Sequence, residues 1–305
     1  MRTRIVVGSR GSKLALIQTE SVMAKIREVN PHVEMSLSKI TTTGDRDRRT
    51  PLDRMGVAIF VKELEEALLD GRIDIAVHSL KDVPTEIPQG LCLLAVTERL
   101  DPRDALVAKS RLNEFVASSK IGTGSLRRAV QLTRYRPDLK VCSIRGNVDT
   151  RLRKVSAGEV DGIMVAAAAM LRLGWEDRVT EYLPLEHFLP AVGQGALVVE
   201  ARLDDSELAD LILPTNHVPT WQGVMAERAF LRTLGGSCRA PIAALSTVNG
   251  ATLKLEGMIA SPDGKGMLRA SEEGSANSPE EVGVRLAHKL LDMGASAFIA
   301  EVRGK

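Results

Sequence analysis

Apolar positions change their spacing repeatedly along this chain, and the changes predict where strands and helices lie. Short apolar or alternating runs predict strands, whereas apolar residues three and four positions apart predict helices. In the first hundred residues the two kinds of segment alternate, with Ser12 placed to cap the first helix. The predicted strands cover residues 4–7, 33–40, 73–78 and 91–96, and the predicted helices cover residues 12–29 and 59–69. Residues 41–56 are polar and charged and contain Gly and Pro, which predicts a mobile loop.

A second alternation begins near Asp104. Strands are predicted over residues 120–122, 140–144 and 162–166, and helices are predicted from Leu126, from Asp149 and over residues 167–173. Two such series predict two α/β domains, each a doubly wound and mostly parallel sheet. Residues 196–200 predict one more strand, which follows the second series and can cross back to the first. Sheets of this kind bind ligands at the carboxyl ends of their strands.

The last third of the chain predicts a small α+β domain. Its predicted helices cover residues 220–234 and 279–293, and its predicted strands cover residues 243–248, 252–259 and 267–273. We therefore predict domain 1 from residues 1–98 together with 196–215, domain 2 from residues 99–195, and domain 3 from residues 216–305.

Composition narrows the classes of function. The chain has 305 residues and a net charge of +2, yet its 41 cations are 28 Arg and 13 Lys, and aromatic residues make up only 3%. Arg binds carboxylate and phosphate through a planar fork that Lys lacks. A near-neutral chain with few aromatic residues is a poor candidate for binding nucleic acid. The Arg excess indicates local anion sites, and a genomic preference for Arg codons is the alternative.

Other classes are disfavoured by what the sequence lacks. It has no run of about 18 apolar residues, which a membrane span requires, and its first residues do not form a signal peptide. Cys92, Cys142 and Cys238 are far apart and the five histidines do not cluster, so neither a disulfide framework nor a metal site is expected. We expect a cytoplasmic protein that binds no membrane.

The segment VHSLKDVP, residues 77–84, places polar side chains where an apolar strand ends. Ser79, Lys81 and Asp82 follow that strand directly. A carboxylate beside a lysine at such a position can exchange protons or stabilise positive charge. The alternative is a turn in which Asp82 merely precedes Pro84.

The segment IGTGSLRR, residues 121–128, joins a strand to a helix N-terminus through small residues. Backbone N–H groups and the helix dipole attract anions at such a turn. Ser125 adds a hydroxyl group, whereas Arg127 and Arg128 place two cations in the first helical turn, against the dipole. This placement favours a bound anion, and a solvated helix start is the alternative.

The segment SIRGNVDTRLRK, residues 143–154, repeats this arrangement of a strand, a turn of small residues and a helix that carries arginines. Arg145 follows a strand, a Gly-Asn turn comes next, and Arg151 and Arg153 lie on the helix beyond it. Solvated surface arginines are the alternative. Because neighbouring strand–helix units carry the same arrangement of arginines, a ligand with several negative charges is favoured.

The segment LGGSCRAPI, residues 234–242, contains a cysteine in an accessible setting. Glycines precede Cys238 and Arg239 follows it. A neighbouring Arg favours the thiolate, so Cys238 can serve as a nucleophile or as an attachment point. An ordinary loop cysteine is the alternative.

Together these segments resemble the porphobilinogen deaminase family, also called hydroxymethylbilane synthases, of tetrapyrrole biosynthesis. The resemblance runs in order over nearly the whole chain. It rests on GSRGSKLALIQ (8–18), TTGD (42–45), FVKELEEALLDGRIDIAVHSLKDVP (60–84), DPRDAL (101–106), GTGSLRR (122–128), RGNVDTRL (145–152), LPAVGQGAL (189–197), AERAFLRTLGGSC (226–238) and PIAA (241–244). It implies two α/β domains like those of type II periplasmic binding proteins and a small α+β C-terminal domain.

The resemblance also implies an activity. The family is a transferase with one dipyrromethane cofactor per chain, which the enzyme makes from its own substrate and holds through a thioether. Four porphobilinogen molecules are added in turn, each losing ammonia to give an electrophilic azafulvene that the growing chain attacks. Hydrolysis then releases 1-hydroxymethylbilane. The implied partners are porphobilinogen and the growing polypyrrole chain, and we expect a monomer that binds no nucleic acid.

The resemblance further assigns roles to individual positions. It makes Asp82 the catalytic residue and Cys238 the site of covalent attachment. The residues that bind the cofactor are then Cys238, Ser12, Lys81, Asp82, Thr123, Ser125, Arg127, Arg128, Arg145 and Gly146. The residues that bind the substrate are then Arg10, Ser12, Arg145, Arg151 and Gln194, and no residue is assigned to a metal.

This sequence departs from the family pattern at three places. MGVAIF, residues 55–60, stands where the family often has a Gly-Gly-Lys-Gly segment before the aromatic residue. Gly124 stands where a hydroxyl residue is common, and Ser237 stands where a glycine is common. A non-catalytic anion-binding protein on the same fold is the alternative function, and it explains the strand-end arginines but not Cys238 together with Asp82.

Overall fold

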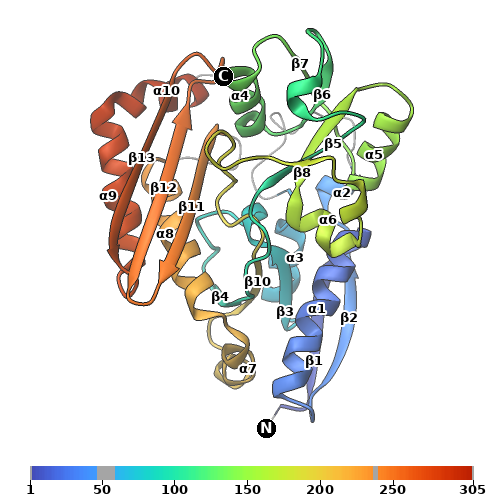
Figure 1. The fold of residues 1–305 in the computed structure, drawn as a ribbon. Coiled ribbons are helices and arrows are strands. Elements are labelled where there is room, and N and C mark those ends of the chain that lie inside the picture. Colours follow the sequence, from blue (N-terminus) through green and yellow to red (C-terminus); the bar gives the residue numbers. More distant parts are fainter. Residues whose placement is uncertain (1, 47–58, 236–239, 304–305) are drawn as a thin grey trace.

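Three separate sheets organise the part of the chain that the computed structural model describes, which is residues 2–46, 59–235 and 240–303. Two of these sheets have five strands and helices packed beside them, and the third has three strands (Figure 1). This arrangement confirms the predicted α/β class with a small α+β unit at the end of the chain. The exact domain boundaries stay a prediction.

The first sheet has the strand order β2-β1-β3-β10-β4. β1 is parallel to β2 and β3, whereas β10 is antiparallel to both of its neighbours. The strands are β1 (Arg4–Arg10), β2 (Glu34–Ile40), β3 (Ile75–Ser79), β4 (Leu91–Val96) and β10 (Leu197–Arg202). The helical elements of this unit are α1 (Lys13–Val29), α2 (Thr43–Arg46), α3 (Lys62–Leu69), η2 (Leu80–Asp82), α7 (Ser206–Ile212) and η5 (Leu213–Thr215).

The second sheet repeats this plan with the order β7-β6-β8-β5-β9. β6 is parallel to β7 and β8, and β5 is antiparallel to both of its neighbours, so β5 corresponds to β10 of the first sheet. The strands are β5 (Asp104–Ala108), β6 (Lys120–Gly122), β7 (Lys140–Cys142), β8 (Gly162–Ala166) and β9 (Glu181–Tyr182). The helical elements are η3 (Leu112–Glu114), α4 (Leu126–Tyr135), α5 (Val148–Ser156), α6 (Ala167–Leu173) and η4 (Glu176–Arg178).

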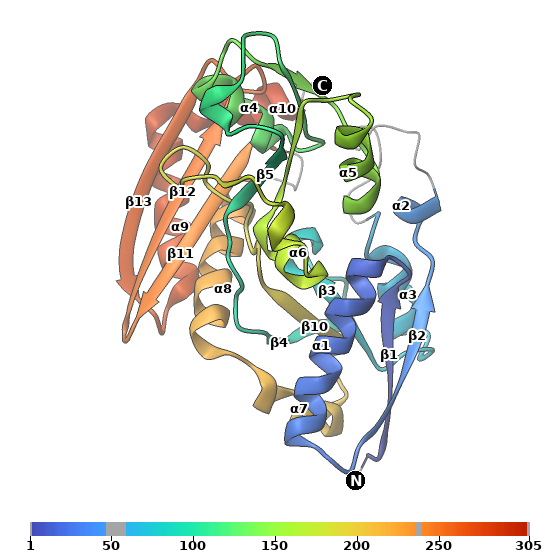
Figure 2. The ribbon, with the colours of Figure 1, turned by 45° about the vertical axis from the view of Figure 1, so that its right-hand side comes forward.

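The chain passes between these two units twice, from β4 to β5 and from β9 to β10. The two connecting segments lie against each other, because Leu100 donates its N–H to Gly195 at 3.2 Å and Arg99 donates its Nε–H to the carbonyl of Gln194 at 2.8 Å. On the other side of the junction α1 contacts α6, as Figure 2 shows. The two units therefore meet at a junction that both connections share.

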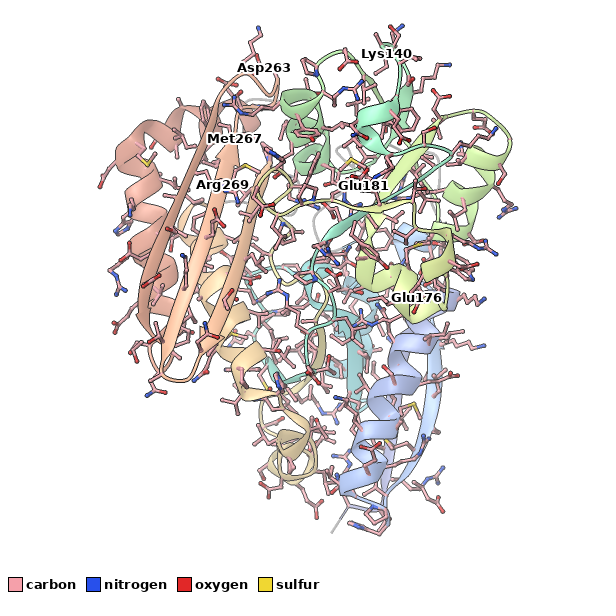
Figure 3. All side chains as sticks on the ribbon, viewed as in Figure 1. Lys140, Glu176, Glu181, Asp263, Met267 and Arg269 are labelled. Atoms are coloured by element: carbon pink, nitrogen blue, oxygen red, sulfur yellow. The ribbon has the colours of Figure 1, made fainter. Side chains whose placement is uncertain are left out.

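The third unit packs two helices against an antiparallel sheet of order β11-β12-β13. Its strands are β11 (Ile242–Asn249), β12 (Thr252–Ala260) and β13 (Met267–Ser275). Its helical elements are α8 (Val218–Thr233), α9 (Pro279–Leu290), η6 (Leu291–Ala295) and α10 (Ser296–Arg303). Arg269 on β13, labelled in Figure 3, donates to the backbone carbonyls of Leu185 and Glu186 and so ties this unit to the second one.

The predicted patterns account for the cores of the elements. Ile5 and Val7 of β1 are buried against Val22 and Ile26 of α1, which occupy one face of a helix. The Ser12 hydroxyl caps this helix by accepting from the Ala15 N–H at 3.3 Å, as its position predicted. Every strand predicted from periodicity is present, with bounds that differ by a few residues.

One local prediction is wrong. Within the segment predicted as a loop, Thr43–Arg46 form the short helix α2, while residues 47–58 lie outside the described part of the chain. Asp45 and Arg46 donate their N–H groups to the Thr42 carbonyl, and the Asp45 carboxylate pairs with Arg10 of β1. That long-range ion pair stabilises a turn which local polarity alone does not indicate. The elements β9, α7 and α10 were not predicted either.

Candidate functional site

A cavity of about 960 Å³ opens between the two α/β units. The predicted site residues within the described ranges all line it, namely Arg10, Ser12, Lys81, Asp82, Thr123, Ser125, Arg127, Arg128, Arg145, Gly146, Arg151 and Gln194. Cys238 lies outside the described residues, and Ala240, two positions later, lines the cavity. These residues meet because the carboxyl ends of parallel strands lie at one edge of each sheet.

The end of β1 brings a cation and a helix N-terminus to the cavity. The Arg10 guanidinium donates to both carboxylate oxygens of Asp45, at 2.6 and 3.1 Å, and lies 4.1 Å from the centre of the Phe60 ring. Burial alone raises the pKa of Asp45, but the bonds from Arg10 and Thr42 outweigh it and lower the pKa. Arg10 is therefore already matched to a carboxylate in this structure.

The end of β3 brings Lys81 and Asp82 to the cavity on the short turn η2. Leu80 is buried beneath this turn against Gly193, where φ is 71° and a Cβ atom would lie 2.9 Å from Leu80 Cγ, so glycine is required. Lys81 Nζ donates to Oε1 of Gln194 at 3.4 Å. The pKa of Lys81 is lowered to about 8, mainly by burial and also by Arg128, whereas Asp82 opposes the shift.

Asp82 differs from the other acids of the lining. Asp45 pairs with Arg10, and Asp149 pairs with the exposed Arg153 at 3.4 Å. Among the described residues, no hydrogen bond or ion pair shorter than 4.0 Å engages the half-buried Asp82 carboxylate, although it acts electrostatically on Lys81 and Arg151. A carboxylate placed in this way can meet a positive charge on a ligand.

In the second unit, the first turn of α4 carries two buried arginines. The Ser125 hydroxyl accepts from the Arg128 N–H at 3.5 Å and caps the helix. Arg127 and Arg128 are 4% and 6% exposed and both bind Asp104, the first residue of β5, at 2.7 and 2.8 Å. Burial alone raises the pKa of Asp104, but the two guanidinium groups hold it well below its usual value. A solvated helix start is thereby excluded.

Asp104 also changes the interpretation of those two arginines. Their placement against the helix dipole suggested that an external anion compensates them, whereas one carboxylate of the protein already does so in part. Two guanidinium groups share a single buried carboxylate, and the Nε of Arg127 has no hydrogen-bond partner among the described residues. The pair therefore keeps one net positive charge for a ligand.

Arg145 and Arg151 add two further cations after β7. Arg151 donates its Nε–H to the Gly146 carbonyl at 2.8 Å, and Gly146 has a φ of 104° with Thr150 close behind it, which excludes a larger residue. The pKa of Arg151 is lowered to about 10, mainly by burial and also by Arg128 and Arg145. Like charges are thus crowded together, and an anionic ligand relieves the repulsion.

Gln194 lies where the two units meet. Its side-chain amide donates to the Pro102 carbonyl at 2.7 Å and to Asp104 at 2.9 Å, while its oxygen accepts from Lys81 and Arg128, each at 3.4 Å. Because it is only 1% exposed, Gln194 acts here mainly as a bridge between the strand ends.

Sequence reasoning missed two residues of this site. Asp104 was noted only as the point near which the second alternation begins, and its partners are more than twenty positions away. Arg172, in the last turn of α6, lines the cavity and donates to the Gly195 carbonyl at 2.8 Å, and burial lowers its pKa to about 10. The sequence signal for Arg172 was its position as the one charged residue of the otherwise apolar helix α6.

Two features are absent from the described residues, which are 2–46, 59–235 and 240–303. Within those ranges, no group of three or more His, Cys, Asp or Glu side chains is placed to hold a metal ion. None of the helices described there is long and apolar enough to span a membrane.

Comparison with known proteins identifies the family. The family model described as "Porphobilinogen deaminase, dipyromethane cofactor binding domain" matches residues 5–210, and the model described as "Porphobilinogen deaminase, C-terminal domain" matches residues 221–292. The chain belongs to the porphobilinogen deaminase family. The resemblance noted in the sequence is therefore confirmed.

Individual relatives in this family match almost from end to end. The porphobilinogen deaminase of Desulforudis audaxviator (strain MP104C) is 47% identical over 306 residues, which are 99% of this chain and 99% of that protein. The porphobilinogen deaminase of Bacillus subtilis (strain 168) is 47% identical over 308 residues, with 99% and 97% covered. Among solved structures, the methionine binding protein MetQ is similar with a TM-score of 0.46 and 12% identity, over 73% of this chain and 93% of that one.

Proposed function

We propose that this chain joins four porphobilinogen molecules head to tail, with loss of ammonia, on a covalently held dipyrromethane and then releases 1-hydroxymethylbilane by hydrolysis. It is accordingly a transferase, a hydroxymethylbilane synthase. The observation that carries the proposal is that Asp82 faces a single cavity in which cations from both units converge. Membership in the porphobilinogen deaminase family supports the same activity, and no comparison favours a non-catalytic anion-binding protein.

The residues of the cavity fit a dipyrromethane. Each pyrrole ring of this cofactor carries two carboxylates, and the lining offers the cations Lys81, Arg127, Arg128, Arg145, Arg151 and Arg172. The Nε of Arg127 has no hydrogen-bond partner among the described residues, and burial lowers the pKa of Lys81 and of Arg151, so a bound carboxylate would favour their charged forms. When bound, the cofactor supplies a nucleophilic pyrrole carbon from which the chain is built.

Asp82 has the central chemical role in this proposal. Loss of ammonia and ring coupling both place positive charge on a pyrrole nitrogen. A fixed carboxylate stabilises that charge and can take up or return a proton. The neighbouring Lys81, with a pKa of about 8, can exchange a proton close by.

The other predicted residues hold and orient acid groups. The N-termini of α1 and α4, capped by Ser12 and Ser125, lie at the cavity and attract carboxylates. Arg145, Arg151 and the Gly146 backbone line the same wall of the cavity. Arg10 binds substrate in this proposal, which requires the substrate carboxylate to compete with Asp45. Gln194 bridges the strand ends behind them.

Cys238 is the proposed attachment point, and the lining by Ala240 and Leu231 on either side of it in the sequence supports this. We also propose the division into residues 1–98 with 196–215, 99–195 and 216–305, a monomeric state, and a place in the cytoplasm. These points rest on the sequence and on the family.

Intact-mass spectrometry tests the proposal directly. Protein purified from a host that makes porphobilinogen is expected to exceed the mass calculated for its 305 residues by one dipyrromethane. The addition is expected to survive dialysis, to be absent in Cys238→Ser, and to be present in the control Cys92→Ser. Wild-type protein with only its sequence mass, and with no consumption of porphobilinogen, overturns the proposal.

A further inference from the structure

A buried group of ionisable side chains lies under the first sheet, outside the cavity lining. His78 on β3 pairs in register with Val198, and Glu200 stands two residues further along β10, so both side chains share one face of the sheet. His78 Nε2 lies 2.9 Å from Oε2 of Glu200, and the two side chains are 2% and 0% exposed. Nothing in the proposed reaction uses this pair.

The helix α3 covers this face of the sheet and adds a third member, Glu65, which is 7% exposed. One oxygen of Glu65, Oε1, and one oxygen of Glu200, Oε1, are buried and have no hydrogen-bond partner among the described residues. An ionised carboxylate is costly to bury without partners. Ionising both acids therefore carries a large cost in free energy, even when His78 is protonated.

The surroundings of Glu65 reinforce this conclusion. The pKa of Glu65 is raised to about 7, mainly by burial and also by Glu200 and, to a smaller extent, by the exposed Glu66 on the same helix, whereas His78 opposes the shift. From β4, Cys92 lies near Glu200, since burial and that carboxylate together raise the pKa of its thiol. From β1, the helix meets Gly8, which lies against Leu64.

We propose that Glu65 is kept as a neutral carboxylic acid beside the hydrogen-bonded His78–Glu200 pair, and that this cluster positions the end of β3 that carries Lys81 and Asp82. When Glu65 loses its proton to solvent, a second negative charge is left buried against Glu200. The contact between α3, β3 and β10 then weakens.

The location of the cluster explains how it can act on the site. Asp82 lies only four positions after His78 on the same stretch of chain. Beyond the His78–Glu200 pair, the strand end is held by pairing of Ser79 with Leu197 and by the Leu80 N–H, which donates to the Ala196 carbonyl at 3.1 Å. Any movement of β3 against β10 therefore displaces the turn that presents Asp82.

Infrared spectroscopy on the intact protein tests the protonation state without any assay of activity. The carbonyl stretch of a buried protonated carboxyl group is expected below pH 7 and is expected to disappear with a midpoint near pH 7. The band is expected to be missing in Glu65→Gln and unchanged in Glu66→Gln, which removes an exposed acid from the same helix. Absence of the band in wild-type protein, or its persistence in Glu65→Gln, overturns the proposal.

A coupling variant checks that the three groups form one cluster. Glu200→Gln removes the neighbouring negative charge, so the midpoint of the infrared band is expected to move to lower pH. An unchanged midpoint in a folded Glu200→Gln protein contradicts the cluster. If this variant does not fold, His78→Gln replaces it: His78 lowers the pKa of Glu65, so the midpoint is expected to move to higher pH, and an unchanged midpoint contradicts the cluster.

The positioning role is tested by the pH profile of kcat/KM, and this arm rests on the proposed function. If only the form with neutral Glu65 is active, wild-type activity falls about tenfold from its plateau by pH 8, one unit above the midpoint. Glu65→Gln is expected to escape that fall and to keep only a later fall from Lys81, while Glu66→Gln follows wild type. Superimposable profiles for wild type and Glu65→Gln overturn the positioning role. Loss of porphobilinogen consumption in every protein instead counts against the proposed function, because the infrared result is independent of it.

Discussion

The two α/β units share one scaffold but place different charges on it. In both, a serine caps the helix after the first parallel strand, Ser12 in one unit and Ser125 in the other. The first unit presents Asp82 with Lys81. Its Arg10 pairs with Asp45, and each of these two side chains is about one-fifth exposed. The second unit presents a buried group of arginines around Asp104. The duplicated fold therefore supplies equivalent positions, and their occupants divide the chemistry between a carboxylate and a set of cations.

The strongest way to break this division is to remove the carboxylate. Asp82→Asn is expected to lower kcat by about 10²–10⁴-fold, the usual contribution of a positioned acid or base, while the covalent cofactor stays attached. Steady-state assays and intact mass measure the two effects. The matched control is Asp149→Asn in the second unit, which lines the same cavity but pairs with an exposed arginine. Equal losses in both variants contradict the assignment of the carboxylate role to the first unit.

The two Arg–Asp pairs give a comparison of stability. Asp104→Asn leaves two buried guanidinium groups without their partner and is expected to lower the free energy of unfolding by about 3–5 kcal/mol. Asp45→Asn breaks a more exposed pair and is expected to cost at most about 1 kcal/mol. Urea denaturation at pH 7 measures both.

The direction in which pH changes the free energy of unfolding follows from the lowered pKa of Asp104 and of Asp45 in the folded state. Each carboxylate contributes its stability above the ordinary pKa of 3.8 and loses it as the pH falls through the lowered value. The difference between wild type and Asp104→Asn should therefore shrink only in strong acid. A difference that is already small at pH 7 contradicts the counter-ion role of Asp104.

Two arginines of α5 test which cations of the second unit bind the ligand. Arg151→Leu is expected to lower kcat/KM by about 10–100-fold, since a hydrogen bond to a charged group contributes about 1.5–3 kcal/mol. Arg153→Leu changes a side chain that is 75% exposed and is expected to stay within about twofold of wild type. Kinetics of porphobilinogen consumption distinguish them. Similar values for the two variants indicate that Arg151 has only a structural role.

The smallest expected effect is the loss of a helix cap, and it tests whether Ser12 and Ser125 have equivalent roles in the two α/β units. Ser12→Ala and Ser125→Ala each remove a helix cap and are each expected to lower the free energy of unfolding by about 0.5–2 kcal/mol. Ser278→Ala is the control, because the Ser278 side chain makes no capping hydrogen bond to α9. Thermal or urea denaturation measures all three. A loss confined to one of the two capping serines argues against equivalent roles in the two units.

Much of the fold was predictable because it is local. The strands β4, β6 and β8 coincide with the predicted ranges, since short apolar runs bounded by turns leave little ambiguity about a buried strand. The candidate residues were also predictable as a set. Most of them follow strand ends, and parallel strands bring their carboxyl ends to one edge whatever the details of packing. Others, such as Gln194, which precedes β10, came only from the resemblance to the family.

What sequence reasoning could not supply are the partners of those residues. Asp104 reaches Arg127 and Arg128 only because β5 enters the second sheet antiparallel beside β8. Arg172 reaches the cavity only because α6 packs where the two units meet. The turn at Thr43–Arg46 exists because Asp45 meets Arg10 from a strand 35 positions earlier.

The sequence by itself determined the family, the alternation of elements, the helix caps and the list of residues that line the cavity, because these depend on local spacing and on motifs. The tertiary structure alone decided which charges compensate each other and which remain for a ligand. It also placed Glu65 beside His78 and Glu200. The physical reason is that burial and pairing set the charge state of an ionisable group, and both depend on neighbours that chain folding brings together from distant positions.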